Sequence, residues 1–295
     1  MKVKALTWAL LTKISMGNPN ASLTEGNVQT AKKITTPDGS QIDYISGQCQ
    51  RHGMKERLVD KGFEMSTPID GEVETTMCDP VEYIDDDLFG YLDAKGRKKR
   101  TSPLRIAPMI SLFPYRGDRD LLTKTRKATD RGGNMVETEI YSTILRGGGL
   151  LELDRVGCFQ ETEVKENSSL DTTNSTKIER INATLDVMKH IWTGGKQTNM
   201  LTDISPKFIV FAFTTEKVPF LLEYLKADEK GNIDQNGLKE ALTNAGEIID
   251  EVIIGTTGVF NTEGINEEEF DKTTILPINE AFDKVKEKVE KLFAE

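Results

Sequence analysis

Cysteine and histidine are scarce in this chain of 295 residues, which has three of the former (Cys49, Cys78, Cys158) and two of the latter (His52, His190). The cysteines are odd in number and too scattered for a disulfide framework or a CxxC metal site. Two histidines are a poor basis for a metal centre or an acid–base pair. We therefore expect no metal, no cofactor and a reducing, cytoplasmic setting.

Long apolar runs are also missing, as are the motifs GxxxxGK[ST], GxGxxG and HExxH. The first residues, "MKVKALTWALL", imitate a signal peptide, but the apolar run is of minimal length and alternates as a β-strand does. The composition, 37% hydrophobic and 29% charged, is ordinary for a soluble globular protein. We expect no association with a membrane.

Acidic residues predominate, but the charge is segregated along the chain. Residues 95–131 contain twelve Lys or Arg and three Asp, a net charge of +9, whereas the whole chain carries −10 and the remainder therefore −19. Such a pattern is typical of a protein with one surface for a polyanion and an acidic remainder that keeps it soluble. The alternative is a solvated basic loop.

Hydrophobic periodicity predicts an α+β fold. The expected elements are a strand at 3–14, a helix at 46–59, strands at 104–113 and 136–145, a helix at 177–191 and a buried strand at 206–213. This βαββαβ order is that of a ferredoxin-like or RNA-recognition-motif sheet. Insertions interrupt it at 17–33, which we read as a polar loop, at 60–103, and at 114–136, which we read as a basic hairpin.

The residues beyond 214 predict an extension on the same core rather than a separate domain. It comprises helices at 218–226 and 237–245, a strand at 251–260 and a C-terminal amphipathic helix. Within it, "DEKGNIDQNG" imitates a calcium loop, but the twelfth position is Thr243 instead of a bidentate glutamate. We interpret it as a turn between helices. The run "RGGGLLELD" is expected to be a bulge or loop.

The stretch "YISGQCQRHGMKERL" at 44–58 has three competing interpretations: a Cys49/His52 nucleophile pair, a phosphate cradle, or a solvated helix face. Catalytic Cys/His pairs normally come from distant segments, which argues against the first. The free N–H groups of a helix start favour anions. "TGGKQ" at 193–197 offers a second phosphate cradle, since glycines let backbone N–H groups approach closely; the alternative is a simple helix C-cap.

Five segments, taken in order, resemble the DevR-like family of CRISPR-associated proteins. They are "KKITTPDGSQIDYISGQCQRHGMKERL", "DPVEYIDDDLFGYL", "YRGDRDLLTKTR", "VETEIYS" and "GGKQTNMLTDISPKFIVFAF". Members of this family are backbone subunits of type I Cascade complexes, and the sequence is most similar to the B subtype. The resemblance extends to about residue 214 and is weak beyond it.

The resemblance implies a hand-shaped protein whose copies assemble along a CRISPR guide RNA and present it for pairing with target DNA. The RRM-like palm would comprise 1–59, 104–113 and 137–295, the helical finger 60–103 and the β-hairpin thumb 114–136. Other Cascade subunits (end-capping, large, small and guide-processing) would be its partners. The implied RNA contacts are Ser46, Gln48, Arg51 and Lys55 on the helix, Arg116, Arg119, Lys124, Arg126 and Lys127 on the thumb, and Gly194, Gly195, Lys196 and Gln197 in the glycine loop.

The family implies no catalytic centre, in agreement with the missing motifs. Two alternatives remain open at this point. One is a ferredoxin-like endoribonuclease that processes the guide, for which His52 is the only candidate acid or base in a basic setting. The other is a DNA-binding regulator, as the family name suggests.

Overall fold

The computed structural model describes residues 2–66, 76–94, 96–124, 134–193, 195, 197–267, 270 and 272–294, with the side chains at 123, 124 and 134 excepted. The strands are β1 (Ala5–Gly17), β2 (Ala21–Glu25), β3 (Val28–Ala31), β4 (Lys33–Thr35), β5 (Gln41–Ile45), β6 (Tyr91–Asp93), β7 (Lys98–Arg100), β8 (Leu104–Ser111), β9 (Gly117–Lys124), β10 (Asn134–Glu152), β11 (Phe208–Thr214), β12 (Ile249–Thr256) and β13 (Thr273–Pro277). The helices are α1 (Gly47–Asp60), α2 (Ile84–Phe89), the 3-10 turn η1 (Glu161–Glu163), α3 (Asn174–Lys189), α4 (Gln197–Met200), α5 (Gln235–Asn244) and α6 (Ile278–Ala294).

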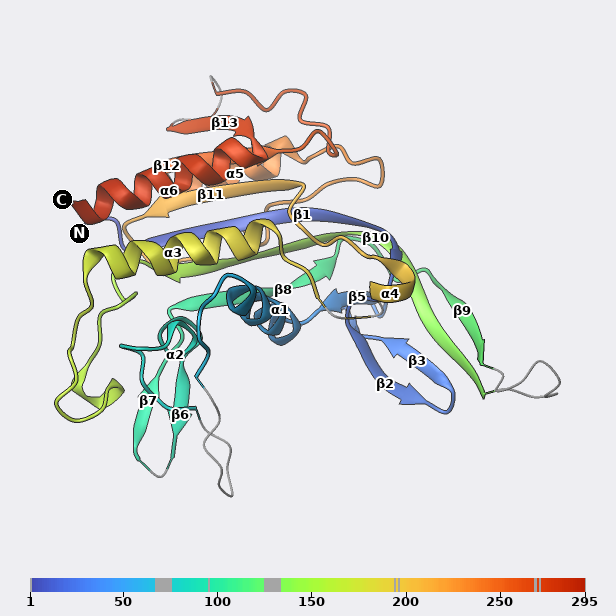
Figure 1. Cartoon of the computed structure of the whole chain (residues 1–295). Helices are drawn as coiled ribbons and strands as arrows, with labels where there is room; N and C mark the ends of the chain where they lie inside the picture. The colour runs from blue at the N-terminus through green and yellow to red at the C-terminus, as the bar shows by residue number, and fades with distance from the viewer. Residues whose placement is uncertain are drawn as a thin grey trace.

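One large sheet organises the molecule, with the order β13-β12-β11-β1-β10-β8-β5-β4 (Figure 1). Its centre, β11-β1-β10-β8, is antiparallel throughout. With α1 and α3 these strands follow the predicted βαββαβ order along the chain. The α+β class is therefore confirmed. The C-terminal strands β12 and β13 continue the same sheet, as expected of an extension on one core.

The two faces of the sheet have separate apolar cores. On one face α1, α3 and α6 cover strands β1 and β11, and Phe282 of α6 meets Phe211 edge-on at 5.1 Å between ring centroids. On the other face α5 and the segment around Leu221 and Leu225 cover β11 and β12. The alternation of apolar side chains along β1 and β11 supplies both cores, since successive residues of a strand point to opposite faces.

The glycine run lies inside β10 and allows close strand packing. The pairing of β10 with β8 shifts register between Arg146 and Gly148, so the predicted bulge is confirmed. A Cβ on Gly148 would lie 2.4 Å from the Trp8 carbonyl oxygen, and one on Gly149 would lie 2.5 Å from the Trp8 indole. A side chain at either position would collide with Trp8 on the neighbouring strand β1.

Three local predictions were wrong. Residues 17–33 hold the hairpin β2–β3, which β10 stabilises by pairing with β3. Residues 218–226 form turns instead of a helix, since the segment is too short to be helical without help and Leu221 and Leu225 are buried against the sheet. The described part of 60–103 is less helical than expected, because it holds the six-residue α2 and the β6–β7 hairpin.

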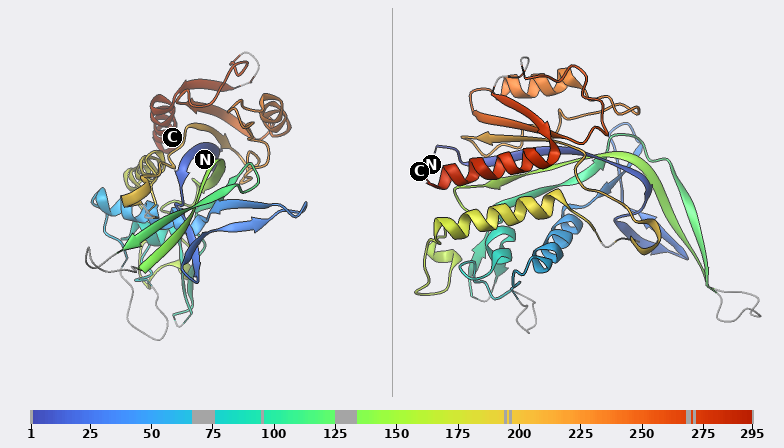
Figure 2. Two further views of the ribbon diagram at one scale, coloured as in Figure 1. Left: turned by 90° about the vertical axis from the view of Figure 1, so that its right-hand side faces the viewer. Right: turned by 45° about the horizontal axis from the view of Figure 1, so that its top comes forward.

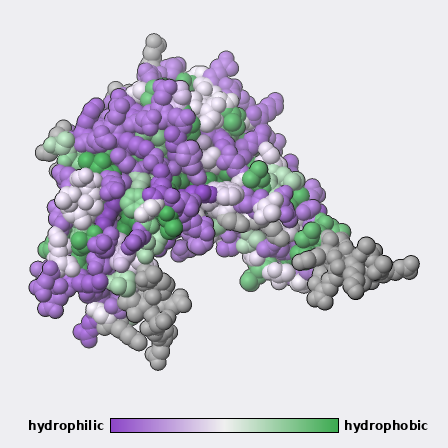
Figure 3. Space-filling model, viewed as in Figure 1, coloured by the Kyte–Doolittle hydropathy of each residue, from purple (hydrophilic) through white to green (hydrophobic). Residues whose placement is uncertain are grey.

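Two projections extend from the body on either side of α1. One is the insertion with α2, β6 and β7; the other comprises the β2–β3 hairpin and the long β9–β10 hairpin (Figure 1). Figure 2 shows from further sides that β9 and the start of β10 reach well beyond the helices. The space-filling view shows a hollow between the two projections (Figure 3). Among the described residues, no helix is long and apolar enough to cross a membrane.

Candidate nucleic-acid interface

Helix α1 lies above this hollow (Figure 1), and its start is capped without any acidic side chain in the first turn. Ser46 is the N-cap: its Oγ accepts from the N–H of Cys49 at 3.2 Å, and its own N–H donates to Oδ1 of Asn20 at 2.8 Å. Gln48 in the first turn is exposed. With no carboxylate to neutralise them, the free N–H groups and the helix dipole make this end electropositive.

Arg51 and Lys55 lie further along α1 and are engaged with the insertion. Arg51 donates to the carbonyl oxygen of Phe89 at 2.5 Å and to Oγ of Ser102 at 3.2 Å. Burial lowers the pKa of this guanidinium. Lys55 pairs with Asp85 at 3.1 Å. The two cations therefore form no free cationic face of α1, and their contact with RNA stays a prediction.

Cys49 and His52 do not face each other as a catalytic pair would. The thiol of Cys49 approaches the carbonyl oxygen of Pro19 at 3.8 Å, and burial raises its pKa, whereas a nucleophilic cysteine needs a lowered pKa. The imidazole of His52 is 75% exposed and lies 3.5 Å from the Glu56 carboxylate. The arrangement does not support nucleophilic chemistry at this helix.

The glycine loop lies beside α1, and hydrogen bonds of the Gln197 side chain hold it in place. A Cβ on Gly195 would stand 2.4 Å from the Pro19 carbonyl oxygen, so only glycine fits there. Gln197 is buried, and its amide donates to the carbonyls of Thr193 and Thr202 and accepts from the Thr202 N–H. Its side chain therefore shapes the loop and points away from solvent. Gly194 and Lys196 lie outside the described residues.

Sequence reasoning missed the residues that join these segments. Asn20 ties the loop after β1 to the start of α1. Lys32, between β3 and β4, is half-buried. Burial raises the pKa of the Cys49 thiol, and the positive charge of Lys32 acts in the opposite direction, so that this charge is felt at the first turn of α1. Within the described part of the chain Lys32 forms no ion pair. The only hint of these contacts in the sequence is the polar run "GNPNAS" together with "KK", which lie in the segment that the sequence predicts as a polar loop.

The β9–β10 hairpin carries exposed cations that have acidic neighbours. Arg119 is 59% exposed and pairs with Glu137 of the opposite strand at 2.9 Å, and Arg116 is 80% exposed and lies 3.8 Å from Glu229. Neither contact is buried, so either arginine is free to turn toward a phosphate. The side chain of Lys124, and Arg126 and Lys127 altogether, lie outside the described residues.

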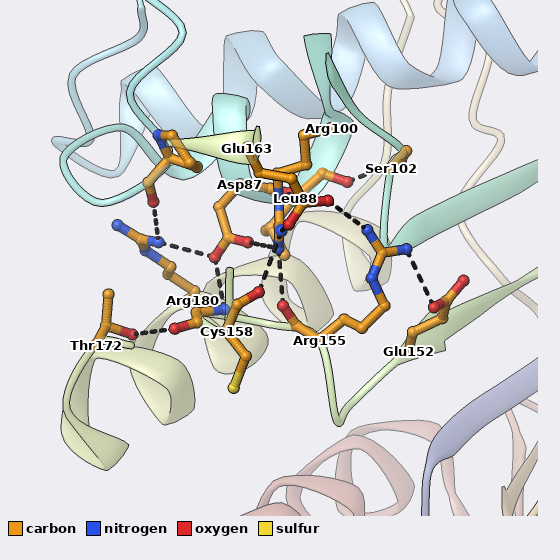
Figure 4. A network of polar contacts seen from close by, with 12 residues as sticks. Asp87, Leu88, Arg100, Ser102, Glu152, Arg155, Cys158, Glu163, Thr172 and Arg180 are labelled. Atoms are coloured by element: carbon orange, nitrogen blue, oxygen red, sulfur yellow. Dashed lines mark hydrogen bonds and ion pairs between the residues drawn. The ribbon is translucent and has the colours of Figure 1, made fainter. Parts of the chain in front are cut away.

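Not every cation of the basic window is on the surface. Arg100 is fully buried and bonds Asp87 of α2 at 2.5 Å and Glu163 of η1 at 2.8 Å (Figure 4). Asp87 also accepts from Arg180 of α3 at 2.7 Å and from the Gly157 N–H at 3.0 Å. This ion network fastens the insertion to α3, and Arg100 adds nothing to a surface for RNA.

The sheet face opposite α1 and α3 is closed. Leu222 packs where a Cβ on Gly148 would stand, and Glu223 pairs with the buried Arg146 at 3.3 Å. RNA-recognition motifs stack bases on that face. Here the segment after β11 occupies it, so the start of α1 and the hollow beside it are the better candidate interface. No group of three metal-ligating side chains occurs among the residues described.

Comparisons with known proteins agree with this architecture. The family model for "CRISPR-associated negative auto-regulator DevR/Csa2" matches residues 18–235, which is most of the chain. The "CRISPR-associated protein Cas7/Cst2/DevR" of Myxococcus xanthus (strain DK1622) is 24% identical over 290 residues, with 88% of each chain covered.

Solved structures share the fold at low sequence identity. A chain of a "CRISPR RNA-guided surveillance complex" superposes with a TM-score of 0.60 and 14% identity, covering 96% of this chain and 99% of the other. A chain of a "CRISPR RNA-guided surveillance complex, pre-nicking" gives a TM-score of 0.61 and 11% identity, covering 97% and 100%. Both chains are parts of complexes described as RNA-guided.

Proposed function

The chain belongs to the DevR/Csa2 family of CRISPR-associated proteins, as its sequence motifs predicted, and we propose that it is a non-catalytic backbone subunit of a CRISPR RNA-guided surveillance complex in antiviral defence. In this role it binds the guide RNA, assembles side by side with further copies of itself and holds the guide open for target DNA. The end-capping, large, small and guide-processing subunits of such a complex are its further partners.

The observation that carries this proposal is the acid-free start of α1 above the hollow. The capped first turn, on which the positive charge of Lys32 acts, offers its free N–H groups to a phosphate, and the acidic remainder of the chain repels a polyanion elsewhere. Gln48 is exposed beside this site, whereas Arg51 and Lys55 hold the insertion in place. We therefore propose that the first turn of α1, rather than Arg51 and Lys55, makes the main contact of this helix with RNA.

The palm, finger and thumb are assigned on the same basis. The sheet with its helices is the palm, the α2–β6–β7 insertion is the finger, and the β9–β10 hairpin is the thumb. The thumb carries Arg116 and Arg119 on an exposed two-stranded ribbon with the apolar side chains of Leu121, Leu122 and Met135 in solvent. A lone ribbon is marginally stable in water, so a bound partner is expected to cover it.

Binding and assembly test the proposal directly. Purified protein is mixed with single-stranded RNA of one repeat-spacer unit, and affinity is measured by fluorescence anisotropy while electron micrographs record assembly. We expect tight, salt-dependent binding and regular multimers whose length follows that of the RNA. Binding of one protomer only, or none, overturns the backbone role.

Two further arms address the alternatives. The family description includes negative auto-regulation, so duplex DNA from the promoter of the protein's own operon competes against the RNA. Preference for that duplex favours a regulator. Site-specific cleavage of repeat RNA that disappears in His52→Ala favours an endoribonuclease. We expect neither, since His52 is exposed and its imidazole lies 3.5 Å from the Glu56 carboxylate.

A further inference from the structure

Asp43 of β5 is a buried carboxylate that the proposed function does not use. It is 1% exposed, and its Oδ2 has no hydrogen-bond partner among the described residues. A buried carboxylate without a donor is costly, and proteins usually avoid the cost by binding a proton or by recruiting a cation. Both routes are open to Asp43.

Lys33 is the partner of Asp43 in the β4–β5 ladder. Its ammonium bonds Oε2 of Glu139 at 2.8 Å and lies 4.3 Å from the ring centroid of Tyr115. The positive charge of Lys33 nevertheless lowers the pKa of Asp43. One ammonium therefore stands within electrostatic reach of two carboxylates and bonds only one of them.

Two tyrosines lie at the same junction. Tyr141 of β10 is 4% exposed, and Tyr115, just before β9, meets it edge-on at 6.3 Å. Burial raises the pKa of both phenols; the charges of Glu139 and Asp43 add to the rise for Tyr115, and the charge of Asp43 adds to it for Tyr141. Burial is the largest cause acting on Asp43 and raises its pKa to about 6.

Titratable and charged groups from every neighbouring element take part. Besides Lys33 on β4, Tyr115, and Tyr141 and Glu139 on β10, they are Arg119 and Asp118 on β9, which act on Tyr115, and Cys49 on α1, which acts on Tyr141.

The β2–β3 hairpin and the β9–β10 hairpin are both attached to the body of the protein at this junction. Glu139 accepts not only from Lys33 but also from the N–H of Ala31, the last residue of β3, at 2.8 Å. The N–H of Tyr115 donates to the Gln41 carbonyl of β5 at 2.6 Å and so fixes the chain just before β9. A shift of the Lys33 ammonium away from Glu139 therefore acts on the anchor of the β2–β3 hairpin.

We propose that Lys33, Glu139 and Asp43 form a proton-dependent clasp: with Asp43 protonated, Lys33 is held by Glu139, and with Asp43 ionised, the ammonium is shared between both carboxylates. Sharing weakens the hold of Glu139 on β3. The clasp is a property of the fold and does not depend on RNA binding. Because the pKa of Asp43 is raised in the folded protein, its neutral form contributes stability that is complete below the unfolded value of 3.8 and lost as the pH rises through about 6.

Carboxyl NMR of ¹³C-aspartate-labelled wild-type protein tests the proton. We expect one aspartate to titrate near pH 6, and its signal to be missing in Asp43→Asn. The matched control is Asp118→Asn, which removes an exposed carboxylate on neighbouring β9 and should leave that titration in place. If all aspartates of the wild type titrate below about pH 5, the clasp is wrong whether or not the variants fold.

Hydrogen exchange at the Ala31 amide tests the movement of Lys33. After correction for intrinsic exchange, we expect the protection of this amide in the wild type to fall at least about threefold between pH 5 and pH 7.5, and to stay constant in Asp43→Asn. Protection that does not change with pH in the wild type means that Lys33 stays on Glu139, which overturns the clasp even where Asp43 titrates as expected.

Discussion

Gly53 in the middle of α1 lies directly against the backbone of Trp192: a Cβ on Gly53 would stand 2.3 Å from the Trp192 carbonyl oxygen. Helix α1 is continuous through this glycine, from Gly47 to Asp60. The glycine thus permits a backbone-to-backbone contact that brings the glycine loop next to the start of the helix. A residue unfavourable for an isolated helix is favoured here by the tertiary contact.

Replacing Gly53 by alanine should therefore destabilise the protein. Helix propensity alone favours alanine by about 1 kcal/mol, but the new methyl group meets a carbonyl that cannot rotate away, and overpacking costs about 1–3 kcal/mol. We expect a net loss of about 1 kcal/mol in urea unfolding, within a range of about 0–2 kcal/mol, at unchanged m-value. His52→Ala, an exposed neighbour, should lie within about 0.5 kcal/mol of the wild type. A stabilised Gly53→Ala would show that the helix can shift freely.

Arg51→Ala should destabilise the fold, because the Arg51 side chain is bonded to the insertion. The change leaves the Phe89 carbonyl without its 2.5 Å donor and uncovers the Phe89 ring, over which the guanidinium lies at 5.1 Å. An unsatisfied buried acceptor costs about 1–3 kcal/mol. Thermal and urea unfolding check this, with exposed Gln48→Ala as the control. An Arg51→Ala protein of wild-type stability but weakened RNA binding would restore Arg51 as an RNA contact.

Asp87→Asn should be the most damaging of these substitutions. Asp87 and Arg100 are both fully buried, and Asp87 also bonds Arg180. Removing the negative charge leaves buried guanidinium groups without compensation, and breaking such a pair costs about 3–5 kcal/mol. Urea unfolding and limited proteolysis of the insertion report the loss. The exposed pair of Arg57 and Asp60 provides the control, since Asp60→Asn should change stability by less than about 1 kcal/mol. Equal effects of the two variants would contradict the role given to the network.

Lys32→Gln should weaken binding to single-stranded RNA about equally for all sequences. Each lost phosphate contact lowers the slope of log K against log salt by about 0.7 per protomer. Lys61→Gln is the matched control, because it makes the same charge change at the opposite end of α1, where Lys61 pairs with Asp186 at 3.2 Å. Anisotropy titrations at several salt concentrations provide the slopes. Identical slopes for the two variants would remove Lys32 from the interface.

Much of the architecture was available from the sequence, because periodicity reflects burial directly. The strands at β1, β8, β10 and β11 and the helices α1 and α3 were predicted in order, and their order defines the central sheet. The C-terminal helix α6 was equally clear, since Phe282, Val285 and Val289 recur at helical spacing and are all buried. The family was identified from five short segments, and the family model confirms it.

The candidate interface could be predicted only in part. The start of α1 was found because Ser46 before a helix is a local capping signal, and the structure has that cap. The roles of Arg51, Lys55 and Arg100 were not readable, because a cation looks the same in sequence whether it faces solvent or a buried carboxylate. Their partners are distant along the chain: Phe89 is 38 residues from Arg51, Asp85 is 30 from Lys55, and Asp87 is 13 from Arg100.

The sequence by itself determined what depends on neighbours along the chain: which segments alternate, where helices start, which residues are basic and to which family the chain belongs. Only the tertiary structure decided which cations are free, that Gln197 turns inward, that the segment after β11 closes the sheet, and that Oδ2 of Asp43 has no donor among the described residues. The physical reason is that burial and pairing of polar groups are set by contacts between distant segments. The local sequence pattern does not reveal which partner, if any, each polar group contacts in the folded protein.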